Sequence, residues 1–97
     1  MNEAIEVVIF KAKAGVSDEQ LRTAALAVTP ILGKMPGFIS REFGISENGR
    51  YIDVVHWKDL PSAKAAAEKV MDIPKCGESF GLIDQNQMQF MHFTKVA

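Results

Sequence analysis

Residues Ile5–Lys13 read IEVVIFKAK, and this stretch decides the fold because its apolar side chains fall on both faces of a strand. Its β-branched and aromatic residues favour extended backbone, which ends before Gly15. Successive side chains of a strand point to opposite faces, so a sheet with one solvated face alternates apolar and polar residues. The run Val7–Phe10 is apolar at every position. We therefore expect a sheet that is covered on both faces.

The flanking sequence supplies three further strands and two main helices in the order βαββαβ. Ser17 and Gln20 form a capping pair at the start of the first helix. Pro30 predicts a kink in that helix, because proline has no N–H for the helical hydrogen bond. Asn48 and Gly49 together predict a tight hairpin turn. The expected elements are a first helix from Ser17 to Met35, strands at Phe38–Ile45 and Arg50–Lys58, a second helix at Leu60–Met71, a helical turn within Lys75–Leu82 and a strand at Gln87–Val96.

This order of elements predicts an α+β, ferredoxin-like βαββαβ fold, with residues 1–97 as a single domain. Right-handed crossovers give a four-stranded antiparallel sheet with both helices on one face. The other apolar face would be an aggregation liability if it met water. We expect a second copy of the chain to cover it, which makes a homodimer through the sheet face, a dimeric α+β barrel. The alternative is a monomer whose own loops cover that face.

Composition and charge exclude several other classes of protein. Eleven Lys plus Arg stand against twelve Asp plus Glu, a net charge of -1, so no nucleic acid partner is expected. No apolar run approaches the ~18–20 residues that span a bilayer, and the first residues carry no secretory signal, so no membrane partner is expected. The one cysteine, Cys76, cannot form an internal disulfide, which indicates a reducing compartment. These features predict a small cytoplasmic domain.

Three ionisable side chains on the expected strands form the candidate catalytic group: Glu6, Asp53 and His92. The first strand lies between the third and the fourth in this topology, so the three side chains converge if their faces agree. Parity alone leaves that alignment open. Ionisable groups among apolar neighbours have displaced pKa values, which suits proton transfer near neutral pH. His92 would then be the general base or acid, held by a carboxylate.

Aromatic side chains share strand parity with these groups and are candidate substrate-binding walls, because flat substrates stack on such rings. The alternative reading of the cluster is structural. In that reading Glu6 and Asp53 are partly solvated near strand ends, and His92 is a core or interface histidine. The candidate walls are Phe10, Trp57 and Phe90.

The remaining reactive residue types carry weaker predictions. A metal site is not expected, because the chain has two distant histidines, one cysteine and no His-x-x-x-His pair. His56 has the parity opposite to Trp57 and is expected at the surface or the dimer face. Arg41, which shares parity with Phe43, is expected to form an intersubunit ion pair, with binding of an anionic substrate as the alternative. Cys76 is expected to be a buried structural thiol rather than a reactive one.

The chain resembles the dimeric α+β barrel superfamily in its layout, in Pro36-Gly37-Phe38 at the start of the second strand, and in Trp57 at the end of the third. The nearest branch is the antibiotic-biosynthesis-monooxygenase-like (ABM) group, and the resemblance covers the whole chain. One uncharacterised subgroup of that branch is similar at Glu6, Phe10, Asp53, Trp57, Asp84 and His92.

That resemblance implies a range of activities, because the superfamily includes cofactor-free quinone-forming oxygenases, haem-degrading enzymes, isomerases and proteins with no known reaction. The haem-degrading branch relies on a strand-one asparagine and on a tryptophan and a histidine near its second helix. Here the first strand carries Glu6, and residues 60–82 contain neither His nor Trp. Haem degradation is therefore not expected.

The resemblance implies a cofactor-independent monooxygenase-like enzyme that acts on a small aromatic or polycyclic molecule, with no cofactor and no metal. One alternative is a non-catalytic dimer that binds a small ligand or contributes to a stress response. Another is a purely architectural module that oligomerises. The discriminating feature is whether Glu6, Asp53 and His92 converge beside a pocket or lie scattered and solvated.

Overall fold

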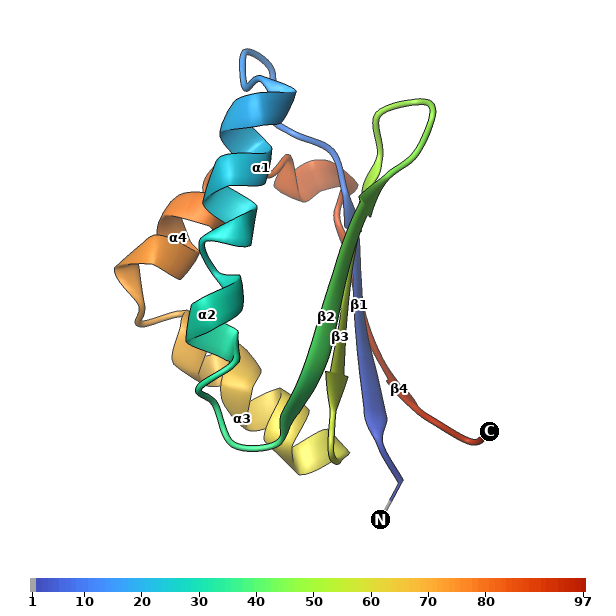
Figure 1. The fold of residues 1–97 in the computed structure, drawn as a ribbon. Coiled ribbons are helices and arrows are strands. Elements are labelled where there is room, and N and C mark those ends of the chain that lie inside the picture. The colour runs from blue at the N-terminus through green and yellow to red at the C-terminus, as the bar shows by residue number, and fades with distance from the viewer. Residues whose placement is uncertain (1) are drawn as a thin grey trace.

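The computed structural model describes residues 2–97 and confirms the expected α+β ferredoxin-like fold, in which helices cover one face of an antiparallel sheet (Figure 1). The strands are β1 (Ala4–Phe10), β2 (Phe38–Ile45), β3 (Tyr51–Trp57) and β4 (Gln89–Thr94). The helices are α1 (Asp18–Leu26), α2 (Thr29–Leu32), α3 (Leu60–Val70) and α4 (Pro74–Phe80), followed by the 3-10 turn η1 (Gln85–Gln87). The strand order is β2-β3-β1-β4, so β1 lies between β3 and β4 as predicted.

The first predicted helix is broken in two rather than kinked. α1 ends at Leu26 and α2 begins at Thr29, so Pro30 lies in the first turn of a new helix. Proline is well accommodated there, because the first turn of a helix leaves its N–H groups unpaired in any case. The predicted apolar stripe nevertheless keeps facing the core across the break, since each of its members is buried: Leu21, Ala25, Val28, Leu32 and Met35.

The predicted helix start and hairpin are also present. The Ser17 side chain accepts a hydrogen bond from the Gln20 backbone N–H at 3.0 Å, which caps α1. Gly49 has a φ of +82°, the left-handed conformation that the turn between β2 and β3 requires. Asp59 caps α3 by accepting from the Ser62 backbone N–H at 2.8 Å. Local sequence signals therefore set the ends of these elements correctly.

We expect Gly37→Ala to be the most damaging glycine substitution in the chain. Gly37 has a φ of +85°, and a Cβ built there would meet the Ser62 side chain at 2.6 Å. Strained backbone of this kind costs about 1–3 kcal/mol, and the clash at the start of α3 adds to it. Urea unfolding measures the loss. Gly49→Ala is the matched control, because Gly49 has the same backbone strain and no atom within 4 Å of the new Cβ. If the two variants lose the same free energy of unfolding, the predicted clash between residue 37 and Ser62 is contradicted.

The core lies between the sheet and the helices in two clusters. One cluster surrounds Trp57, which is 1% exposed and packs edge-on against Phe38 at 5.8 Å between ring centroids. The other surrounds Phe10, whose ring stacks on Tyr51 at 5.4 Å. Along β1, Glu6 lies between Ala4 of the first cluster and Phe10 of the second, and along β3, Asp53 lies between Val55 and Tyr51 in the same way.

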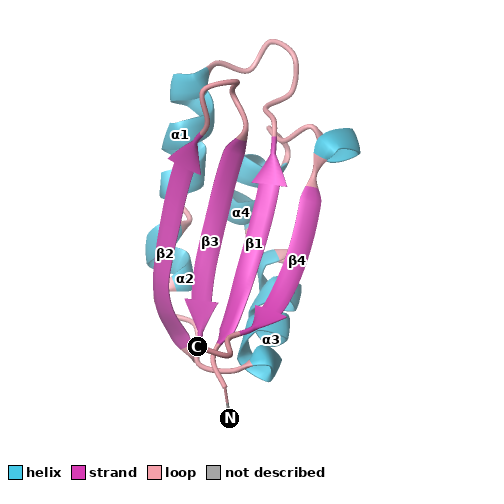
Figure 2. Ribbon diagram, turned by 90° about the vertical axis from the view of Figure 1, so that its right-hand side faces the viewer, coloured by secondary structure: helices cyan, strands magenta, loops and turns pink. Residues whose placement is uncertain are grey.

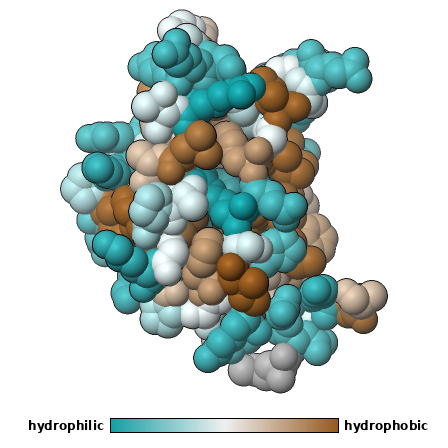
Figure 3. Space-filling model, viewed as in Figure 1, coloured by the Kyte–Doolittle hydropathy of each residue, from teal (hydrophilic) through white to brown (hydrophobic). Residues whose placement is uncertain are grey.

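The opposite face of the sheet has no helix over it, as Figure 2 shows with the strands in front of the helices. The alternate residues of every strand project there, because their neighbours along the same strand project into the core. Hydrophobic side chains reach the right-hand margin of Figure 3, on the side where Figure 1 draws the sheet. The apolar residues of this open face are Ile5, Val7, Ile9, Ile52, Val54, Met91 and Phe93. The open face is therefore as apolar as the two-sided pattern of the first strand predicts.

Candidate functional site

Four ionisable side chains lie on the helix-covered face of the sheet. The strand register aligns Arg41 with Val55, Val55 with Glu6, and Glu6 with His92, so these residues form one row across all four strands. Asp53 lies in the next row of the same face. Glu6, Asp53 and His92 therefore share one face of the sheet, the alignment that strand parity alone left open.

Glu6 and His92 form a largely buried pair. Glu6 Oε1 and His92 Nε2 are 3.0 Å apart, and the two side chains are 14% and 16% exposed. Burial raises the pKa of the Glu6 carboxyl, the hydrogen bond and charge of His92 oppose that rise, and the Asp53 charge adds to it. The two groups are within hydrogen-bond distance of each other, so one proton can be shared between them.

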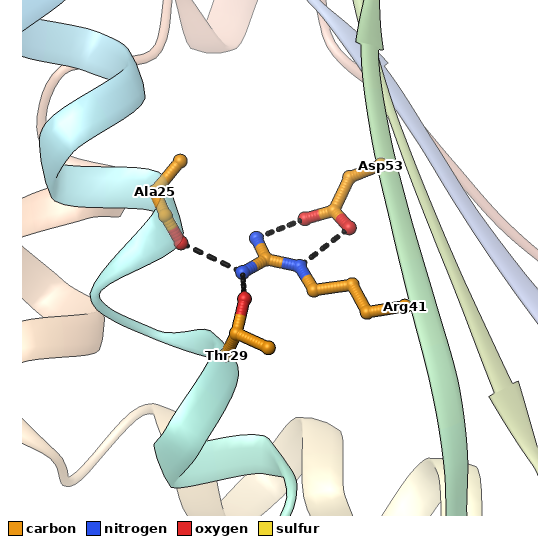
Figure 4. A network of polar contacts seen from close by, with 4 residues as sticks. All are labelled: Ala25, Thr29, Arg41 and Asp53. Carbon is orange, nitrogen blue, oxygen red and sulfur yellow. Dashed lines mark hydrogen bonds and ion pairs between the residues drawn. The ribbon is translucent and has the colours of Figure 1, made fainter.

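Arg41 holds Asp53 in a bidentate ion pair and also reaches the helices (Figure 4). Its Nε donates to Asp53 Oδ1 at 2.9 Å and its Nη2 donates to Oδ2 at 2.7 Å. Its Nη1 donates to the Ala25 carbonyl at 2.7 Å and to Thr29 Oγ1 at 2.9 Å. The guanidinium thus joins β2 and β3 to the break between α1 and α2.

The prediction that Arg41 forms an intersubunit ion pair is wrong, because its carboxylate partner is Asp53 of the same chain. Its side chain is only 5% exposed. The physical reason is that the register places Arg41 on the helix-covered face, away from the open face where a second copy would bind. The Asp53 charge is compensated by this pair, which leaves the pair of Glu6 and His92 as the better candidate for proton transfer.

A cavity of about 130 Å³ lies between the sheet and the helix layer beside these groups. The strands contribute Glu6, Asp53 and Arg41 to its wall. The helices contribute apolar side chains, among them Val28 and Phe80. Phe80 is 37% exposed, so the cavity reaches the surface beside it. Ionisable groups that converge on an otherwise apolar cavity are the usual mark of a small-molecule site.

A larger hollow of about 630 Å³ lies between α1 and α4, but it is a poorer candidate. Its polar side chains, such as Gln20, Lys75 and Glu78, are exposed and belong to the ordinary solvated surface of the helices. A large volume at the surface says little without groups that could bind or react. The smaller cavity on the sheet is therefore the candidate site.

The three aromatic side chains that were predicted to bind substrate lie in different surroundings. Phe10 lines the cavity, although its ring is mostly occupied by stacking on Tyr51. Phe90 is 46% exposed and meets the His92 ring edge-on at 5.1 Å. Trp57 lies in the core and is not among the residues that line the cavity. The structure thus brings Phe10 to the cavity and Phe90 to the histidine, and keeps Trp57 apart from both.

Sequence reasoning assigned no role at the site to Cys76 and Ser79, two of the residues that α4 places at the cavity. Both are buried, and their spacing of three positions puts them on one face of the helix, which was the available signal. Burial raises the pKa of the Cys76 thiol, and the charge of Arg41 opposes that rise. The thiol is buried, as expected for a structural cysteine.

His56 lies on the open face, and its Nε2 is 3.0 Å from Glu42 Oε1. This agrees with the expectation of a surface or dimer-face position. Within residues 2–97, no three His, Cys, Asp or Glu side chains are arranged so that they could hold a metal ion. None of the helices in that range is both long and apolar enough to cross a membrane.

We expect the Glu6→Gln variant to become more stable relative to the wild type as the pH rises. Folding raises the pKa of Glu6, so the stability linked to its protonated form is fully present below its ordinary value of 4.5 and is lost as the pH rises through the folded value. Glutamine stays neutral throughout. His92, Asp53 and Arg41 face this carboxyl and are unchanged in the variant. Urea unfolding of both proteins from pH 4 to pH 8 measures the difference. Glu47→Gln, in the exposed hairpin turn, controls for the loss of one charge, and a difference that stays constant with pH would contradict the expectation.

Comparison with solved structures places the whole chain in one known fold. A variant of SnoaB, a cofactor-independent oxygenase from Streptomyces nogalater, superposes with a TM-score of 0.81 at 14% identity, over 98% of this chain and 94% of that one. A protein from Bordetella bronchiseptica, provisionally described as an antibiotic biosynthesis monooxygenase, superposes with a TM-score of 0.82 at 16% identity, over 100% of both chains. A dimeric ferredoxin-like protein of unknown function from Jannaschia sp. CCS1 superposes with a TM-score of 0.74 at 10% identity, over 96% of this chain and 99% of that one.

The resemblance inferred from the sequence is confirmed at the level of the fold, which this chain shares with ABM-like and dimeric ferredoxin-like proteins along its full length. Comparison with protein-family models gives no match, and comparison with curated proteins gives none either. Identities this low carry the architecture from one protein to another and do not carry the chemistry.

Proposed function

We propose that the protein is a homodimeric, cofactor-independent oxygenase that acts on a small aromatic or polycyclic molecule bearing a hydroxyl group. The observation that carries the proposal is the buried pair of Glu6 and His92, of which Glu6 lines the cavity between the sheet and the helices and His92 lies behind it. The shared fold with a cofactor-independent oxygenase supports it. The alternative of a non-catalytic binding protein predicted scattered or solvated ionisable groups, and the convergence of these groups favours the enzyme.

In the proposed reaction the pair first acts as a base and removes the hydroxyl proton of the substrate. The resulting phenolate is electron-rich at the ring carbon para to its oxygen, and that carbon forms a bond to molecular oxygen. The protonated pair then donates its proton to the outer oxygen of the new peroxide.

In the second stage the pair removes the hydrogen of the same ring carbon while the O–O bond breaks. The departing hydroxide takes this proton back and leaves as water. One oxygen atom stays in the quinone and the other is in the water, so atoms and electrons balance without an added reductant. One acid–base pair serves both stages, which is why a group with a raised pKa suits the task.

Asp53 and Arg41 are assigned supporting roles. The negative charge of Asp53 contributes to the raised pKa of Glu6, while Arg41 compensates the charge of Asp53 itself. Arg41 also donates to the Ala25 carbonyl, so it holds the helix layer in position over the cavity. Both are therefore positioning residues for the pair of Glu6 and His92.

The homodimer is proposed to form through the open face of the sheet. The positions of that face on β1 are all apolar, and one structure with this fold is a dimer. A two-fold axis would bring the same patch of both copies together. The cavity lies on the other face, under the helices, so the dimer leaves it accessible.

Oxygen uptake tests the proposed function. Each member of a panel of hydroxylated one-, two- and three-ring aromatics is added to the purified protein, and oxygen consumption is followed with an electrode while product water and quinone are quantified. The proposal expects uptake with at least one compound and its loss in the His92→Ala variant. Uptake that is unchanged in both the His92→Ala and Asp53→Asn variants would remove the proposal.

A further inference from the structure

We propose that the cavity binds a single aromatic ring carrying one neutral hydroxyl group, and that single-ring phenols are the substrate class of the site. The statement that these phenols are substrates rests on the proposed function. It narrows the proposed substrates from small aromatic or polycyclic molecules to molecules with a single ring. Its physical basis is the volume of the cavity and the hydrogen-bonding groups left unpaired in its wall.

The volume of the cavity limits its occupant to one ring. An engineered apolar cavity of about 150 Å³ takes up one benzene molecule, and the cavity here is close to that size at about 130 Å³. Sites for larger ligands start at roughly 300 Å³. A second fused ring would therefore have to displace the wall or protrude past Phe80 into solvent.

The side chains that line the cavity have little room to move outward. Val55, Val28 and Ile83 line it and belong to the two packed core clusters, where each is less than one-tenth exposed. Protein cores are close-packed, so enlarging the space by one ring means repacking both clusters. Phe80 is the exception, because it is partly exposed and can be trimmed without opening the core.

Glu6 and Arg41, both in the wall, each keep hydrogen-bonding capacity that no hydrogen bond among the described residues uses. Four of the five N–H donors of Arg41 are used, which leaves one hydrogen on Nη2. Glu6 uses Oε1 for His92, and its Oε2 accepts no hydrogen bond. A hydroxyl group both donates and accepts, so one hydroxyl of a ligand satisfies the Glu6 oxygen and the Arg41 hydrogen together.

The charges of the wall exclude a carboxylate in place of the hydroxyl. Arg41 is already neutralised by Asp53 through two hydrogen bonds. Glu6 then presents a second carboxyl to the same space. A benzoate would place a third carboxylate beside these two in a region of low dielectric constant, where like charges are costly. The anionic substrate considered for Arg41 is thus disfavoured.

Amide NMR titration of the full protein tests this assignment. The probes are phenol, hydroquinone, 1-naphthol and benzoate, added to isotopically labelled protein while backbone shifts are followed. We expect saturable shifts at cavity residues with phenol and hydroquinone, and a Kd at least ten times higher for 1-naphthol and for benzoate. Either of these two probes binding as tightly as phenol would overturn the assignment, as would phenol shifts confined to residues outside the cavity.

The Phe80→Ala variant is expected to bind 1-naphthol more tightly than the wild type does. Removing this ring opens the mouth of the cavity, so the Kd for 1-naphthol is expected to fall by about ten-fold while the Kd for phenol changes little. Leu26→Ala is the matched control, because Leu26 is exposed on α1 outside the cavity. A Phe80→Ala variant that still discriminates against 1-naphthol as the wild type does would contradict the size limit.

The outcomes separate this inference from the proposed function. Phenol that binds in the cavity but supports no oxygen uptake, with no uptake from any compound of the panel, removes the proposed function and leaves the ligand assignment standing. Oxygen uptake that depends on His92 but occurs only with two- or three-ring substrates supports the proposed function and overturns the ligand assignment.

Discussion

Replacing His92 with alanine is expected to lower kcat for oxygen uptake by about 10²–10⁴-fold, the usual contribution of a positioned acid or base. The imidazole Nε2 is 3.0 Å from the Glu6 carboxyl, so the variant leaves that carboxyl buried without its partner. The KM should change less than kcat, because the lost interaction serves the chemical step rather than ground-state binding. Initial rates over a range of substrate concentrations separate the two constants.

A double variant shows whether His92 and Glu6 act as one unit. If they share one proton, the His92→Ala and Glu6→Gln changes together should reduce kcat about as much as either does alone. Independent residues would instead give the product of the two single losses, and that result would contradict the shared role. Glu3→Gln is the matched control, since Glu3 lies just outside β1 in an exposed ion pair with Lys95.

The Val7→Asp variant is expected to convert the proposed dimer to a monomer. Val7 lies on the central strand of the open face, opposite Val54 on β3 and Met91 on β4. An unpaired charge buried at an interface costs about 3–5 kcal/mol, and a two-fold axis places two such charges in one interface. Light scattering after size exclusion should report the 10.7 kDa of one chain in place of twice that mass.

Controls make the dimer prediction decisive. Leu26→Asp places the same charge on an exposed residue of the helix layer and should leave the mass at that of the proposed dimer. Phe93→Asp, at a half-exposed position of the open face, is a second test that disturbs the monomer less. Circular dichroism verifies that each variant is folded. A wild-type protein that is monomeric at micromolar concentration would contradict the proposed interface directly.

The sequence was most informative where local chemistry decides the structure. Residues 38–45 form the predicted strand with the predicted ends. The reason is that β-branched and aromatic residues favour a strand, and the Pro-Gly and Asn-Gly turns on either side end it. Capping by Ser17 and Asp59 was equally local. The two-sided apolar pattern of β1 also predicted the open face, since alternation along a strand is a property of the backbone.

The sequence was less informative where two distant segments had to be placed against each other. Parity assigns Arg41 to one of two faces of β2. Only the register with β3 places it on the helix-covered face, where it forms an ion pair with Asp53. Trp57 illustrates the same limit, because whether a strand residue meets a cavity or a packed core depends on where the helices end.

The amino-acid sequence by itself thus determined the order of the elements, the antiparallel sheet and the presence of two apolar faces, because each follows from residue types a few positions apart. Only the tertiary structure decided which charged groups share a cavity, how large that cavity is, and that α4 closes it with Cys76 and Ser79. The reason is that side-chain direction is local, whereas distance across the sheet depends on register and on the packing of a separate layer.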